Sequence, residues 1–224
     1  MTDPLITAAQ LRLFAPHCDG LAVAPALDAA ARAFRIDTPR RVRHFMAQTH
    51  VESAGFTRLE ESLTYTHWEA LHAAWPAHFP TEASARPFLM KPATLAELVY
   101  GQRLGNHAAC DGWNYRGRGF IQITGRANYG RASTWTGLDL VNSPDMAAQP
   151  KTAAVIAAAF WDVEGLNELA DADAGEALTT TILAGVHDAE VQDLKAETQK
   201  INGGLNGWPD RERQLQRAAA IWKD

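Results

Sequence analysis

Apolar residues recur at three- and four-residue spacing along most of the chain, and alternating β-branched stretches are nearly absent. This pattern predicts a mainly helical protein. The expected helices span 5–14, 26–34, 39 to about 55, 147–164, a shorter piece through 169, 188–201 and 209–222. Between 62 and 117 the pattern is weaker and predicts one short helix before Pro76, another ending near Gly105, and a loop at 106–119. The stretch FIQIT, residues 120–124, is the one segment expected to be extended.

The helix that begins at Pro39 carries an acid on its apolar side. Thr38 can cap it, and Pro39 suits a first helical turn because its missing N–H is no loss there. The apolar stripe runs through Val42, Phe45, Met46 and Thr49 and then reaches Glu52. Burial and the negative end of the helix dipole would both raise the pKa of Glu52, as a general acid requires. The alternative is a solvated acid at a frayed helix end, which spacing alone favours.

A second carboxylate would complete a hydrolytic pair, because glycoside hydrolysis uses two. Glu60, Glu61 and Glu69 are the downstream candidates, although each taken alone is more readily a surface acid. If 120–124 is extended, Gln122 and Thr124 share one polar face between glycines. The amide could then hold a sugar group and the hydroxyl could orient a water; otherwise this is an edge strand with its polar side in solvent.

Four ordered blocks resemble those of the family 19 glycoside hydrolases, which include plant-type chitinases and phage endolysins. They are AQTHVESAGF (47–56), EESLTY (60–65), YRGRGFIQITGRANYG (115–130) and INGGLNGWPDR (201–211). Two more, YGQRLGN (100–106) and FWDVEGLNELAD (160–171), are similar to the endolysin branch. The resemblance runs from about residue 35 to the C-terminus, and the ordered set is far more specific than any single block.

The resemblance implies a lysozyme-like, mainly α fold with a substrate cleft and at most a small β element. Residues 1–224 would form one catalytic domain, with an N-terminal helical part at 1–34, pictured as an auxiliary cap, and a glycoside hydrolase core at 35–224. It further implies an inverting mechanism in which the general acid is Glu52, the general base is Glu61 and the hydroxyl that holds the attacking water is that of Thr124. Substrate contacts would come from Gln122, Asn128, Asn202 and Tyr65, with Arg211 matching an arginine that pairs with the catalytic region.

Two departures accompany this assignment. Val51 stands where a histidine commonly precedes the acid, and His50 comes one residue earlier. Glu60 beside Glu61 leaves the base open by one residue.

The composition and short motifs argue against several other classes of protein. Charged residues make up 21% of the 224 residues, the net charge is −5, and no Lys/Arg run is present, which argues against a nucleic-acid partner. The best apolar run, 153–161, is too short to span a bilayer, so stable membrane insertion is not expected. Cys18 and Cys110 form no disulfide framework, which suits a reducing compartment. HVES is not HExxH and no four-ligand set is visible, so we expect no metal and no other cofactor.

These observations together predict an endolysin that hydrolyses β-1,4 bonds of the peptidoglycan glycan strand and lyses bacteria. The start of the chain shows no basic and apolar leader pattern, so we expect synthesis in the host cytoplasm. The protein, expected to be a monomer, would reach the cell wall in the periplasm once a holin opens the membrane. The alternatives are a chitinase acting on N-acetylglucosamine polymers and a non-catalytic wall-binding homologue.

Overall fold

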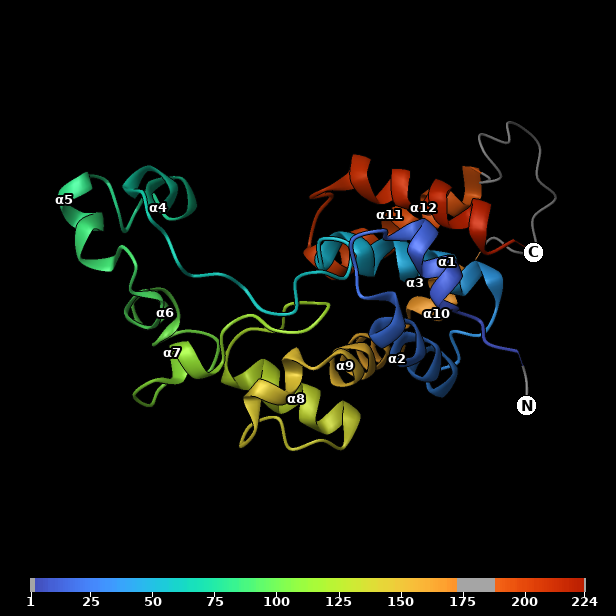
Figure 1. The fold of residues 1–224 in the computed structure, drawn as a ribbon, viewed down its shortest axis with the longest axis horizontal. Helices are drawn as coiled ribbons and strands as arrows, with labels where there is room; N and C mark the ends of the chain where they lie inside the picture. The colour runs from blue at the N-terminus through green and yellow to red at the C-terminus, as the bar shows by residue number, and fades with distance from the viewer. Residues whose placement is uncertain (1–2, 173–187, 224) are drawn as a thin grey trace.

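The structure, a computed structural model, describes residues 3–172 and 188–223 (Figure 1). Helices dominate this part of the chain and it contains no strand, which confirms the mainly α class. The helices are α1 (Ala8–Phe14), α2 (Gly20–Ala33), α3 (Pro39–Glu52), α4 (Trp68–Ala74), α5 (Glu82–Ala85), α6 (Pro92–Tyr100), α7 (Asp111–Asn114), α8 (Arg126–Thr136), α9 (Pro150–Val163), α10 (Leu166–Ala170), α11 (Asp188–Asn202) and α12 (Trp208–Ile221). Two 3₁₀ turns, η1 (Arg86–Phe88) and η2 (Pro144–Ala148), complete the set.

A large lobe gathers the first three and the last four helices on one side of the molecule (Figure 1). Helix α3 packs against α12, and α2 packs against α9. Their apolar faces meet in one core that includes Leu27, Phe45 and Trp161, all nearly inaccessible to solvent. Leu11 and Phe14 of α1 belong to the same core, so the N-terminal helices are built into this lobe.

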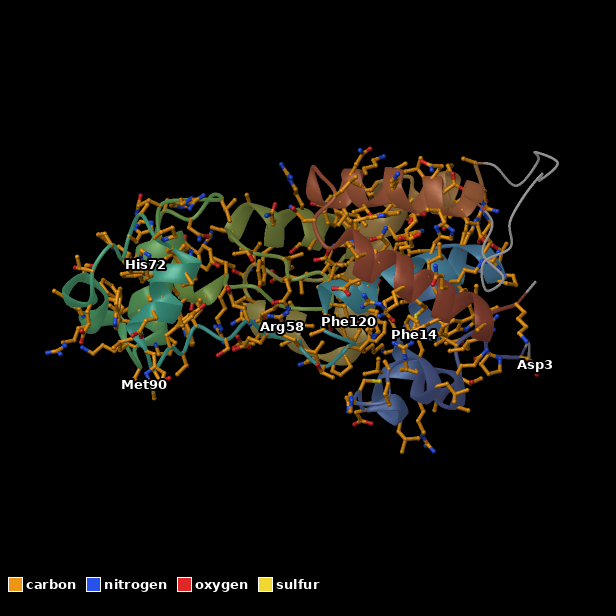
Figure 2. All side chains as sticks on the ribbon, turned by 90° about the horizontal axis from the view of Figure 1, so that it is seen from above. Asp3, Phe14, Arg58, His72, Met90 and Phe120 are labelled. Carbon is orange, nitrogen blue, oxygen red and sulfur yellow. The ribbon has the colours of Figure 1, made fainter. Side chains whose placement is uncertain are left out.

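A small lobe, made of α4 to α7, lies at the opposite end of the molecule (Figure 1). It has its own apolar cluster, built from Leu63, Leu71, Phe79, Leu95 and Val99. Figure 2 shows His72 and Met90 in this lobe and Phe14 in the large one, with Arg58 and Phe120 between them. A chain segment that passes between two separately packed lobes is well placed to line a substrate cleft.

The expectation that residues 120–124 are extended is wrong. The N–H of Arg118 donates to the carbonyl oxygen of Ile123 at 3.2 Å, and the N–H of Ile123 donates back at 2.9 Å. The residues between them form a tight reversal, with left-handed backbone at Gly119 (φ 78°) and at Gln122 (φ 49°). Arg118 also forms an isolated bridge with Glu60, so the β content is limited to two bridges in the described residues.

Other boundaries differ from the expected ones in the middle of the chain. The helix predicted to end near Gly105 ends at Tyr100, and the predicted loop contains the short α7. The helix predicted from residue 147 is preceded by the 3₁₀ turn η2 and begins at Pro150. Helix α8 was not predicted at all. Within the described residues, no helix combines the length and apolar character needed to cross a bilayer.

Candidate active site

Glu52 is the last residue of α3 and pairs with an arginine. Its side chain is 23% exposed and forms an ion pair with the side chain of Arg211 on α12, which is 4% exposed. Arg211 also donates to the side-chain oxygen of Gln48 and to the carbonyl oxygen of Asn206. Glu52 is therefore not the solvated acid of a frayed end, and it does not lie among apolar groups alone.

A cavity of about 310 Å³ opens beside Glu52. Gln122, Thr124 and Asn128 line it together with Glu52, so the structure brings together four residues singled out from the sequence. The rest of its wall is largely apolar, with the rings of Trp135 and Phe160 and two charged side chains, Arg131 and Glu164. Both cysteines of the chain are free thiols.

Backbone carbonyls hold the three polar side chains of this wall. The amide nitrogen of Gln122 donates to the carbonyl oxygens of Gly119 at 2.8 Å and Arg58 at 3.3 Å, which uses both of its hydrogens. The Thr124 hydroxyl donates to the Gln122 carbonyl at 3.1 Å, and the Asn128 amide donates to the Thr124 carbonyl at 2.8 Å. Since their hydrogens are engaged, the Gln122 amide and the Thr124 hydroxyl present oxygen acceptors to a ligand.

Glu61 lies next to Gly117 and Gln122 rather than in the wall of that cavity, and it is held by neutral donors. It accepts from the Gly117 N–H at 2.5 Å and from the Tyr100 hydroxyl at 3.0 Å. Burial, followed by the Glu61 charge, raises the pKa of Tyr100, and the same two causes raise the pKa of Tyr65. A Cβ at Gly117 would come within 3.2 Å of both the Glu61 carboxylate and the Gln122 amide oxygen, so a side chain at this glycine would crowd both groups.

Glu60 has a different environment from its neighbour. Its carboxylate accepts from Arg116 at 2.6 and 3.0 Å and from Arg118 at 3.4 Å. The Arg116 guanidinium also stacks on the Trp113 ring, 3.8 Å from its centroid. Glu60 thus forms ion pairs with two arginines and ties its own segment to residues 116–118. Glu61 forms no ion pair with a described residue. Glu69, the third candidate, is exposed on α4.

The remaining predicted residues lie as follows. The Tyr65 ring packs on Trp75, 5.7 Å between centroids, in the small lobe beside Glu61 and Tyr100. The backbone of Asn202 ends α11, and its side chain lies outside the described part of the structure.

Sequence reasoning missed Tyr100 and Gln48. Gln48 could have been found, because it stands one helical turn before Glu52 and so shares its face.

His50 does not take the place of the missing histidine. Residues two positions apart on a helix point in nearly opposite directions, so His50 and Glu52 do not share a face. The His50 ring packs on Phe14 and Phe56, with centroids at 5.0 and 5.9 Å. Burial, followed by the charge of Arg217, lowers the pKa of His50 to about 4. His50 is therefore a partly buried histidine that is neutral near pH 7.

No cluster of three or more His, Cys, Asp or Glu side chains arranged to hold a metal ion occurs in the described ranges. The chemistry that the described site offers is that of two carboxylates, a hydroxyl and amides.

Comparisons with known proteins concern the family and the fold of this chain. The sequence profile of glycoside hydrolase family 19, described as Chitinase class I, matches residues 31–207. A Haemophilus influenzae protein described as a glycosyl hydrolase family 19 domain-containing protein is 34% identical over 169 residues, which cover 75% of this chain and 72% of that protein. An Arabidopsis thaliana endochitinase is 50% identical over 94 residues, 42% of this chain and 26% of its own length.

Among solved structures, chitinase C from Streptomyces griseus has a similar fold, with a TM-score of 0.60 and 16% identity over 99% of this chain and 78% of the other. A bacterial family 19 chitinase has a TM-score of 0.52 and 19% identity over 96% and 95% of the two chains.

Proposed function

The chain belongs to glycoside hydrolase family 19 and is a glycosidase, and from this premise we propose that it hydrolyses β-1,4 bonds of the peptidoglycan glycan strand. In this proposal Glu52 is the general acid and Glu61 the general base of an inverting reaction. Peptidoglycan, rather than neutral chitin, is the substrate that the charges of the cavity favour.

The mechanism follows from the partners of each carboxylate. Glu52 donates its proton to the glycosidic oxygen as the bond to the anomeric carbon breaks, and Arg211 stabilises the carboxylate that forms. Water attacks the anomeric carbon from the opposite face and gives its proton to Glu61. The Thr124 hydroxyl, whose own hydrogen is engaged, accepts a hydrogen bond from that water. The Gly117 N–H and the Tyr100 hydroxyl donate to Glu61 and fix the orientation of its carboxylate.

The observation that carries the substrate assignment is a pair of charged side chains in the cavity wall. Arg131 and Glu164 line the same cavity as Glu52, and neither forms an ion pair with a described residue. Chitin carries no ionised group for them to bind. The peptide stems of peptidoglycan carry carboxylates and ammonium groups, which match both signs of charge.

The biological role extends this proposal. The blocks at 100–106 and 160–171, which resemble the endolysin branch, support a phage or prophage endolysin that lyses the host. We place its synthesis in the host cytoplasm and its action, as a monomer, on the wall after a holin has opened the membrane. A second candidate, chitin hydrolysis, is favoured by the identity to a stretch of the Arabidopsis endochitinases.

Purified sacculi and colloidal chitin, each incubated with the wild type, Glu52→Gln and Glu61→Gln, test the function. We expect the wild type to clear sacculi and release reducing ends, and each variant to lose about 10²–10⁴-fold of that rate. Glu69→Gln, an exposed acid on α4, is the matched control and should retain full activity. Reducing ends from chitin without clearing of sacculi would make the protein a chitinase. Binding to sacculi without reducing ends from either polymer would make it a wall-binding homologue.

A further inference from the structure

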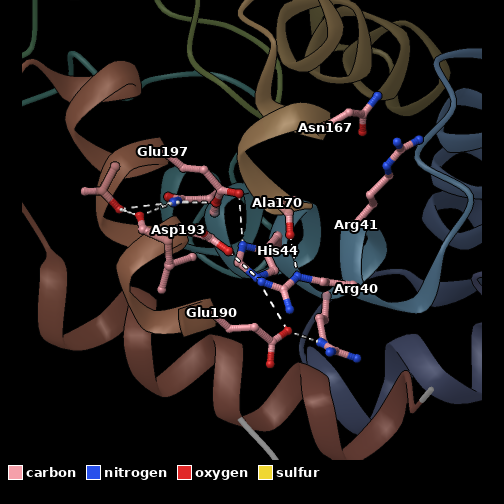
Figure 3. A network of polar contacts seen from close by, with 12 residues as sticks. Arg40, Arg41, His44, Asn167, Ala170, Glu190, Asp193 and Glu197 are labelled. Carbon is pink, nitrogen blue, oxygen red and sulfur yellow. Dashed lines mark hydrogen bonds and ion pairs between the residues drawn. The ribbon is translucent and has the colours of Figure 1, made fainter. Parts of the chain in front are cut away.

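A row of buried polar side chains extends from Arg211 into the interface of α3 and α11. Gln48 of α3 contacts Thr198 and Glu197 of α11, and Glu197 contacts His44 at 2.9 Å. His44 faces Glu190 at 3.6 Å, and Glu190 pairs with Arg43 at 2.5 Å. Figure 3 shows Glu197, His44 and Glu190 following one another along this interface.

The orientation of the Gln48 amide is determined by its neighbours. Its nitrogen faces three acceptors on α11, which are the carbonyl oxygen of Leu194 at 3.3 Å, Glu197 at 3.3 Å and the Thr198 hydroxyl oxygen at 3.0 Å. The Thr198 hydrogen is donated to Leu194, so its oxygen can only accept from Gln48. The Gln48 oxygen must then face Arg211, which has only donors to offer.

His44 keeps Glu197 in the acceptor role. Burial lowers the pKa of His44, but the facing Glu197 and Glu190 outweigh it and raise the pKa to about 9. The other charged groups at this interface are Arg40, Arg43 and Asp193. A protonated His44 donates to Glu197, which leaves the carboxylate to accept from Gln48.

We propose that Gln48, oriented by α11, is a positioning residue that fixes the Arg211 guanidinium against Glu52. This inference rests on the proposed role of Glu52 as the proton donor. Arg211 has three side-chain nitrogens, and each donates to a different partner: Nη1 to Gln48, Nη2 to Glu52 and Nε to the Asn206 carbonyl. Gln48 therefore sets the direction in which the remaining nitrogen points, and so the place where the Glu52 carboxylate is stabilised.

The test is a double-mutant cycle of Gln48→Met and Arg211→Lys on a soluble glycan-strand substrate. Gln48→Met keeps the side-chain length but cannot accept from Arg211, and Arg211→Lys replaces the planar fork of donors with one compact ammonium. We expect each variant to lower kcat at least about tenfold with KM unchanged, since neither contact is made to substrate. The double variant should be no slower than the slower single one, because Gln48 acts through Arg211. The alkaline limb of the pH–rate profile should move to higher pH in all three, since the ionised Glu52 loses its positioned cation.

Asp193→Asn is the matched control, because Asp193 also lies on α11 and pairs with Arg40 of α3 at 2.5 Å. It should lower the melting temperature and leave kcat and the pH profile unchanged. Thr198→Val removes one of the acceptors that orient Gln48 and should lower kcat several-fold, so it decides the matter if Gln48→Met does not fold.

The positioning role is contradicted if the two losses multiply in the double variant, or if Gln48→Met and Thr198→Val behave like Asp193→Asn. If Glu52→Gln is itself as active as the wild type, the proposed site is wrong. If Glu52→Gln is inactive while Gln48→Met is unaffected, only the positioning role fails.

Discussion

The two proposed catalytic carboxylates differ in the charge of their partners. Glu52 contacts a guanidinium, which stabilises the anion that remains once the proton has left. Glu61 contacts an N–H and a hydroxyl, which orient it without adding a positive charge. Glu60, one residue away, is engaged by two arginines. This contrast favours Glu61 over Glu60 as the residue that receives the proton of water.

Tyr100→Phe tests the support of Glu61. Loss of the hydroxyl removes a hydrogen bond to a charged group, which contributes about 1.5–3 kcal/mol in typical cases. We expect kcat to fall about tenfold and the acid limb of the pH–rate profile to move to higher pH, because the ionised base is less stabilised. Tyr115→Phe, whose hydroxyl donates to the Val141 carbonyl, is the matched control and should keep both unchanged. An unaltered acid limb in Tyr100→Phe would remove Glu61 from the role of base.

Arg131→Gln tests the substrate assignment at the level of one side chain. It should lower kcat/KM on sacculi at least fivefold and leave the hydrolysis of neutral chitin oligosaccharides unchanged, since only the peptide stems carry an anion for it. Arg12→Gln, on α1 of the large lobe, is the control for the change in net charge. Equal losses on both substrates would show that Arg131 serves the glycan itself and would remove the main support for peptidoglycan.

Among the elements, the long helices could be predicted and the turn that builds the site could not. Helices α3 and α9 each bury one apolar face. The apolar residues of such a face recur at helical spacing, so the sequence pattern predicts these helices directly. Helix α8 has two buried residues, Tyr129 and Ala132, and many Ser, Thr and Gly positions, so its pattern is weak. The reversal at 119–122 depends on a left-handed Gln122, which spacing does not reveal.

The candidate site also has a part that could be predicted from the sequence and a part that could not. Local spacing singled out Glu52 on the α3 stripe, because the residues that define the stripe lie on one helix, but its role as general acid came from the family resemblance. The ion pair with Arg211 joins residues far apart in the chain, as does the bond from Tyr100 to Glu61. Such contacts follow from the packing of α3 on α12 and from the placement of the small lobe, which local patterns do not specify.

The α3–α11 interface should make stability depend on pH. The pKa of His44 is raised from 6.5 to about 9, so its stabilising contribution is complete below pH 6.5 and is lost as the pH rises through 9. The pKa of Glu190 is lowered from 4.5 to about 2 by His44 and Arg43, which outweigh its burial; its contribution is complete above pH 4.5 and is lost as the pH falls through 2. We expect the melting temperature to fall by at least about 5 °C between pH 6.5 and 9.5.

His44→Gln should be less stable at pH 6.5 and should show a much smaller alkaline decline than the wild type. The difference between the two proteins isolates His44 from His50, whose lowered pKa costs stability only as the pH falls from 6.5 through 4. Parallel melting curves for both proteins from pH 6.5 to 9.5 would contradict the ion-pair account of this interface.

At the scale of the whole molecule, the large and the small lobe each have an apolar cluster of their own. Gly112 lies so close to the Ala96 carbonyl oxygen that a Cβ there would approach it to 2.5 Å, so Gly112→Ala must push α7 away from α6. Overpacking of this kind typically costs about 1–3 kcal/mol. We expect hydrogen exchange to quicken in α6 and α7 and to stay slow in α3, α9 and α12, because the two lobes have separate apolar clusters.

Gly130→Ala is the matched control, since the nearest atom to a Cβ there is 4.0 Å away and the residue is inside α8. It should leave exchange in both lobes unchanged. If Gly112→Ala speeds exchange equally throughout the chain, the lobes form one cooperative unit and the two-lobe description is wrong.

The most direct measurement is mass spectrometry of the products released from sacculi, combined with NMR of the first anomer formed. An inverting hydrolase of the glycan strand should release muropeptides that carry one added water at a reducing end, first as the α-anomer of a bond that was β. Glu52→Gln and Glu61→Gln should release these products about 10²–10⁴-fold more slowly. Products without the added water, a first-formed β-anomer, or release by either variant at the wild-type rate would contradict the two-carboxylate account.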